Sequence, residues 1–119
     1  MHMRVIRYLT VVIAALIVSI SVYGYDKAKV DSYIREAEYY TKQAESFERE
    51  AAYYMRQAQK HMKDAEYYSK KGNDSKAKSY MRWAKEASDK ASLRMKKAKE
   101  SRQKAQLRMK WVKDEMRKK

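Results

Sequence analysis

His61 is the only histidine after residue 25 of this 119-residue chain, and no other residue in that range has as many possible chemical roles. Met62 follows it directly, and a predicted hairpin register brings Met81 opposite this pair. One histidine and two thioethers form a soft ligand set that suits copper(I). No His–Met spacing is repeated, however, and methionine also commonly fills apolar gaps. His61 as a packed substitute for an aromatic residue is therefore the simpler interpretation, and we predict no cofactor.

Groupings that usually support catalysis are absent from the sequence. There is no glycine-rich phosphate loop, no nucleophile beside a base and no pair of carboxylates in an apolar setting. Cysteine is absent too, which excludes a disulfide framework, a thiolate metal site and a cysteine nucleophile. We therefore expect that the protein is not an enzyme.

Positive charge is concentrated toward the C-terminus. The formal net charge is +14, and residues 72–119 hold seventeen Lys/Arg against six Asp/Glu. Such asymmetry indicates a surface for an anionic partner, although it also favours solubility. The candidate anion-binding residues are Lys96, Lys97, Lys99, Arg102, Lys104, Arg108, Lys110, Lys113, Arg117, Lys118 and Lys119. Nucleic acid is an alternative partner to lipid, but no recognised motif supports it.

The first 25 residues form a separate apolar segment. Arg4 and Arg7 precede an uncharged run over residues 8–25, which as a helix would span roughly 27 Å, close to the thickness of a bilayer core. A basic start, an apolar middle and small residues near the end also fit a cleavable signal peptide. We predict either a transmembrane anchor or a signal peptide over 1–25. The early arginines favour a cytoplasmic N-terminus, so in a single-pass membrane protein the helical remainder would be exported, to the periplasm or the cell exterior, rather than cytoplasmic.

Long helices must position the remaining residues, because the chain has no proline and only two glycines. One position repeats every seven residues on each side of Gly72, a spacing typical of helices that supercoil together. The repeated alanines, which form the predicted hairpin seam, are Ala37, Ala44, Ala51, Ala58, Ala65, Ala77, Ala84, Ala91, Ala98 and Ala105. Val30 begins the first series, and Val112 ends the second. The series mirror each other about the segment 71–74, as an antiparallel hairpin requires.

The predicted fold is all-α: an N-terminal transmembrane or signal helix followed by a long antiparallel two-helix coiled-coil hairpin. The first long helix is expected over residues 26–71, the turn over 72–74 and the second, strongly basic helix over 75–119. Gly72 can adopt the left-handed conformation that ends a helix, and Asn73 or Asp74 can cap the next one. Because alanine rows bury little apolar area, larger residues beside the seam, such as Tyr40 and Tyr54, must supply most of the burial.

A Tyr-Tyr doublet recurs every 14 residues in the first long segment. The second tyrosine of each doublet flanks the seam, whereas the first points about 160° away from it. In the second segment leucines repeat at the same interval, and two tryptophans lie on the same outer flank. These outer residues, the predicted partner interface, are Tyr39, Tyr53, Tyr67, Leu93, Leu107, Trp83 and Trp111.

These patterns favour a structural or interaction protein. We expect a membrane-anchored helical hairpin that forms homo-oligomers or binds a protein partner through the outer residues and contacts membrane lipid through its basic C-terminal arm. A cationic adaptor for nucleic acid or an acidic envelope polymer is one alternative. An exported Met/His copper-handling protein, with His61, Met62 and Met81 as weak candidate ligands, is another.

Overall fold

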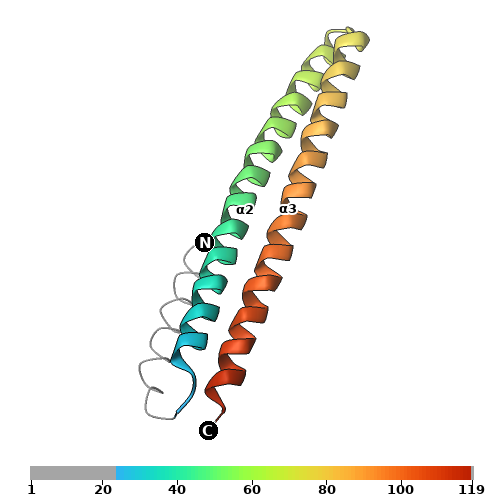
Figure 1. Ribbon diagram of the computed structural model, residues 1–119. Helices are drawn as coiled ribbons and strands as arrows, with labels where there is room; N and C mark the ends of the chain where they lie inside the picture. The colour runs from blue at the N-terminus through green and yellow to red at the C-terminus, as the bar shows by residue number, and fades with distance from the viewer. Residues whose placement is uncertain (1–23, 119) are drawn as a thin grey trace. The chain divides into compact units, whose positions relative to one another are not determined.

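The computed structural model describes residues 24–118, and every regular element in this range is helical. Helix α2 covers Lys27–Lys70 and helix α3 covers Asp74–Met116. The two helices form a hairpin (Figure 1). The prediction of two long helices in an all-helical hairpin is therefore confirmed for residues 24–118.

The predicted transmembrane anchor or signal peptide over residues 1–25 lies outside the described residues, apart from Gly24 and Tyr25. Within residues 24–118, neither helix combines the length and the apolar character needed to cross a membrane. The function of the first 25 residues therefore stays a prediction.

The hairpin divides into two compact units. Among the described residues, the terminal unit consists of residues 24–45 and 99–118, and the turn unit consists of Ser46–Ala98. Helices α2 and α3 both contribute to each unit. Each unit therefore has its own interface between the two helices.

The turn between the helices is a Schellman motif that ends α2. The N–H of Asn73 donates to the carbonyl of Tyr68 at 2.9 Å, and the N–H of Gly72 donates to the carbonyl of Ser69 at 3.1 Å. Gly72 has a φ of +77°, a left-handed conformation that glycine adopts without steric cost. The Asn73 side chain then accepts a hydrogen bond from the Lys76 N–H at 3.2 Å. Of the two expected capping residues, Asn73 is therefore the one that caps α3.

The residues of the heptad series are buried in both units. In the terminal unit these are Val30, Ala37, Ala44, Ala105 and Val112, and in the turn unit they are Ala51, Ala58, Ala65, Ala77, Ala84, Ala91 and Ala98. Val30 is the only large side chain among the described residues that is fully buried. Because the buried side chains are so small, most of the apolar burial must come from residues beside the series.

Candidate interaction surfaces

In the terminal unit, aromatic residues that lie three positions after a seam residue of α2 pack against α3. Tyr33 meets Trp111 edge to face, with ring centres 5.4 Å apart. The Nζ of Lys104 lies 5.5 Å from the centre of the Tyr40 ring, and the guanidinium carbon of Arg108 lies 5.3 Å from the same centre. The rings of Tyr33 and Tyr40 are therefore each covered by an aromatic or a cationic group of α3.

The turn unit shows the same packing. Three lysines of α3 lie over rings of α2 at 4.9–5.8 Å: Lys97 over Phe47, Lys90 over Tyr54 and Lys76 over Tyr68. Tyr68 is also stacked on Tyr80, with ring centres 5.4 Å apart and the two planes only 4° from parallel. Helix α2 thus supplies most of the rings, and α3 supplies most of the cations that cover them.

Two arginines of α3 connect this packing to acidic residues of α2. In the turn unit, the Nε of Arg94 lies 3.0 Å from a carboxylate oxygen of Glu50, and its guanidinium carbon lies 5.6 Å from the centre of the Tyr54 ring. In the terminal unit, the Nε of Arg108 donates to a carboxylate oxygen of Glu36 at 2.8 Å. Each unit therefore contains one cluster in which a guanidinium binds a carboxylate while covering a tyrosine ring.

Four residues of the predicted partner interface lie at the surface of the turn unit. Tyr53, Tyr67, Trp83 and Leu93 are between 41% and 55% exposed. Each outer tyrosine meets the inner tyrosine of its doublet edge to face, with ring centres 5.2–5.4 Å apart. Trp83 likewise meets Tyr80 edge to face at 5.1 Å. These rings are held by their neighbours while about half of their surface faces solvent.

The remaining residues of the predicted interface belong to the terminal unit and differ from one another. Tyr39 and Leu107 are exposed, and Tyr39 meets Tyr40 edge to face at 5.3 Å. Trp111 is half-buried, because it contacts Tyr33 and because the guanidinium of Arg108 lies 4.2 Å from its ring centre. Much of the aromatic surface of Trp111 is therefore already used within the hairpin.

The predicted anion-binding residues fall into two groups. The first group interacts within the protein: Lys97, Lys104, Arg108 and Lys118 contact a ring or a carboxylate of the hairpin, and the half-buried Arg102 also has an interaction partner. The second group is exposed and forms no ion pair with another residue of the range 24–118: Lys96, Lys99, Lys110, Lys113 and Arg117. Lys119 lies outside the described residues. The second group is the part of this set that is free to meet an anionic partner.

A basic row on α2 lies outside the predicted anion-binding set. Its members are exposed and recur every seven residues: Arg35 and Lys42 in the terminal unit, and Arg49, Arg56, Lys63 and Lys70 in the turn unit. The charge of residues 26–71 as a whole is nearly balanced, which hides this row. Counting charge by heptad position, rather than by segment, would have revealed it.

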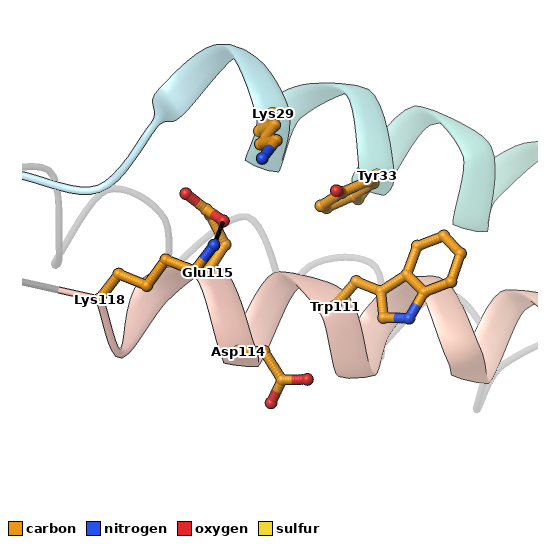
Figure 2. Close-up of a pocket in the computed structure, with 6 residues that line it drawn as sticks. All are labelled: Lys29, Tyr33, Trp111, Asp114, Glu115 and Lys118. Atoms are coloured by element: carbon orange, nitrogen blue, oxygen red, sulfur yellow. Dashed lines mark ion pairs between the residues drawn. The ribbon is translucent and has the colours of Figure 1, made fainter.

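The terminal unit contains a pocket of about 280 Å³ between the start of α2 and the end of α3 (Figure 2). It is lined by Lys29, Tyr33, Trp111, Asp114, Glu115 and Lys118. Glu115 is buried there and binds the Nζ of Lys118 at 2.9 Å. The charge of Lys29 and the backbone of Asp26, the residue that caps α2, also lower the pKa of Glu115. Glu115 at the end of α3 therefore interacts with the start of α2.

The same contacts shift the pKa values of both members of this ion pair. The hydrogen bond from Lys118 lowers the pKa of Glu115 below its ordinary value, and the charges of Lys118 and Lys29 act in the same direction against the opposing effect of burial. The hydrogen bond to Glu115 in turn raises the pKa of Lys118. Both groups are therefore held in their charged forms near neutral pH.

The three weak candidate metal ligands do not share one cavity. His61 packs against Tyr80 and Trp83, with ring centres 6.2 and 6.0 Å apart, and its buried Nδ1 has no hydrogen-bond partner. Met62 and Met81 line a groove to which His61 does not contribute. Within residues 24–118, no group of three His, Cys, Asp or Glu side chains is placed to hold a metal ion.

Comparisons of the chain with protein-family models, with curated proteins and with solved structures found no match. The function must therefore be inferred from the residues of the chain. The described residues form two kinds of exposed surface: aromatic rings that neighbouring rings hold in place, and cations on both helices. Both features are typical of binding to a macromolecule or to a lipid surface.

Proposed function

We propose that this protein is a structural or interaction protein whose helical hairpin associates with a second copy or with a partner protein. The observation that carries the proposal is the exposed set Tyr53, Tyr67, Trp83 and Leu93 in the turn unit. Tyrosine and tryptophan suit such a surface because they tolerate both water and an apolar contact. Since neighbouring rings already hold three of these side chains, association would cost little side-chain entropy.

We also propose that the hairpin contacts anionic lipid through the basic end of α3. Residues 1–25 would anchor the chain as a single-pass membrane protein, with the hairpin exported. The contact between Tyr33 and Trp111 and the pocket that both residues line support this arrangement, because they place the end of α3 beside the start of the helix that follows the proposed anchor. Exposed cations such as Lys113 and Arg117 would then each contribute about 1 kcal/mol at an anionic surface.

Sedimentation and photo-crosslinking of the full chain test the association. We expect the purified protein to form dimers or larger oligomers, or to form an adduct with a partner in cells when Tyr53 is replaced by p-benzoylphenylalanine. The double variant Tyr53→Ser/Leu93→Ser should lose the association and keep its helical circular dichroism. Met95→Ser is the matched control, since Met95 is equally exposed and lies close to Leu93 in α3 but outside the proposed surface. A monomer that forms no adduct from position 53 contradicts the proposal.

A cationic adaptor for nucleic acid or an acidic envelope polymer is the second candidate. It is favoured by the exposed cations of α3 that form no ion pair among the described residues. Binding through phosphate contacts alone would be independent of sequence and would fall steeply with salt. Reversing Lys96, Lys99, Lys110 and Lys113 to glutamate should abolish retention on DNA and heparin. The same charge change at Arg35, Lys42, Arg49 and Lys70 of α2 is the control, and equal losses in both variants would argue against a site on α3.

A further inference from the structure

The turn unit has a second apolar surface, which the proposed association does not use. Residues three and four positions after a seam residue lie on opposite flanks of that seam, so Met55 and Tyr54 face different sides of the hairpin. On the methionine side, a groove of about 500 Å³ lies between α2 and α3. Met55, Met62 and Met81 line it, and all three are about half exposed. These methionines leave apolar surface uncovered in the hairpin alone.

The edges of this methionine groove are basic. Lys63 of α2 and Lys85 of α3 line it, one from each helix, and no acidic residue is among its lining residues. Arg56 and Arg82 are exposed and each directly follows a groove methionine in the sequence. An apolar floor between cationic edges is complementary to a ligand that is apolar on one side and anionic on the others.

The chemistry of the groove argues against two other occupants. Thioethers are soft ligands for copper(I), but two lysines beside them repel a cation. A second copy of the chain would bring an identical basic groove, so contact between two grooves would place their lysines together. A helix with acidic edges meets neither objection. The cleft between two packed helices accepts the side chains of a third helix, and flexible methionines adapt to the shape of such a partner.

We propose that the methionine groove binds an acidic amphipathic helix of a partner protein. The apolar residues of that helix would cover Met55, Met62 and Met81, and its carboxylates would pair with Lys63 and Lys85. The complex would be a three-helix packing in which the exposed thioethers become buried. This binding is independent of the association through the aromatic surface, because the two use opposite flanks of the seam.

Methyl NMR on the full chain in nanodiscs of zwitterionic lipid tests the proposal. The probe is a synthetic helix of about 15 residues with leucines at i, i+3, i+4 and i+7 and glutamates elsewhere. We expect the methyl signals of Met55, Met62 and Met81 to shift and saturate. Met95 is the internal control, because it is 52% exposed, as Met62 is, but does not line the groove. Absence of shifts, or equal shifts at Met95, would overturn the proposal.

Charge variants then test the edges of the groove. Lys63→Glu/Lys85→Glu should weaken peptide binding about tenfold or more, whereas Lys70→Glu/Lys96→Glu, with the same change in net charge, should not. A peptide with lysines in place of the glutamates should not bind. If phosphatidylglycerol vesicles shift the groove methyls and the peptide does not, the groove is a lipid site and the proposal is wrong. Tyr53→Ser/Leu93→Ser should keep full peptide binding, which separates this proposal from the proposed association.

Discussion

Arg94 of α3 lies over the ring of Tyr54 of α2, with its guanidinium carbon 5.6 Å from the ring centre. The same guanidinium forms an ion pair with Glu50 of α2 through Nε at 3.0 Å. A planar guanidinium can stack on a ring and donate hydrogen bonds in its own plane at the same time, which an ammonium group cannot do. Arg94 therefore holds two side chains of α2 and connects the helices at a point where the buried residues are only alanines.

Replacing Arg94 should destabilise the hairpin measurably. We expect Arg94→Ala to lower the free energy of unfolding by about 1 kcal/mol, since it removes a cation–ring contact and a partly exposed ion pair. Arg94→Lys should recover only part of this loss. Urea unfolding followed by circular dichroism measures the effect. Lys96→Ala, at an exposed residue without an ion pair in the described range, should stay within about 0.5 kcal/mol of the wild type. Equal losses for Arg94 and Lys96 would contradict the assigned contacts.

The hairpin could be predicted from the sequence because its signal is periodic. One helix carries a row of alanines at Ala51, Ala58 and Ala65. The other helix carries the mirrored row at Ala77, Ala84 and Ala91, and Gly72 lies between the two rows. Such a pattern depends only on the 3.5-residue period and on turn chemistry, which are both local. The helix ends differ from the predicted bounds by one to three residues, as terminal turns usually do.

The packing of the cations could not be predicted in the same way. Lys97 and Lys104 belong to the predicted anion-binding set, and the structure adds that their ammonium groups lie over Phe47 and Tyr40. A heptad pattern identifies which residues flank a seam, but it does not tell whether a long, flexible lysine side chain points into solvent or bends across a ring. The separation of His61 from the methionine groove, by contrast, follows from the helical period, because His61 and Met62 lie three and four positions after Ala58 and so on opposite flanks of the seam.

Close approach of the helices at the seam predicts a strong size limit at Ala51. Ala51→Leu should force the helices apart and lower the free energy of unfolding by about 1–3 kcal/mol, because Ala51 is buried in the α2–α3 packing. Ala52→Leu is the matched control, since the neighbouring side chain is exposed and leucine is also a good helix former. Thermal unfolding of both variants checks this. If Ala51→Leu is as stable as Ala52→Leu, the seam at this level is not tightly packed.

The turn should depend on the backbone conformation of Gly72. A methyl group added there would meet no atom within 4 Å, so the cost of Gly72→Ala comes only from the positive φ. We expect a loss of about 1 kcal/mol. Asn73→Ala should cost a similar amount, because it removes the side-chain acceptor for the Lys76 N–H. Ser92→Ala, at an exposed position within α3, should not destabilise the hairpin. No loss in either turn variant would show that the helix ends are held by packing alone.

The ion pair between Glu115 and Lys118 makes a prediction about pH. Because the pKa of Glu115 is lowered in the folded protein, its contribution to stability is present above the pKa of the unfolded chain and is lost as the pH falls through the folded value. Lys118 behaves oppositely: its raised pKa gives a contribution that is full below the pKa of an unfolded lysine and is lost as the pH rises through the folded value.

Glu115→Gln should therefore flatten the fall in thermal unfolding temperature below about pH 4. It should also flatten the alkaline fall above about pH 10, because Lys118 loses the partner that raises its pKa. Lys118→Gln should reproduce the acid effect only in part, since Glu115 keeps its interaction with Lys29. It should remove the alkaline contribution of Lys118 completely, because the titrating group itself is gone. Asp89→Asn, in the turn unit, is the control for loss of a carboxylate and should leave both slopes in place. An unchanged acid slope in Glu115→Gln would mean that Glu115 and Lys118 do not form this ion pair in solution.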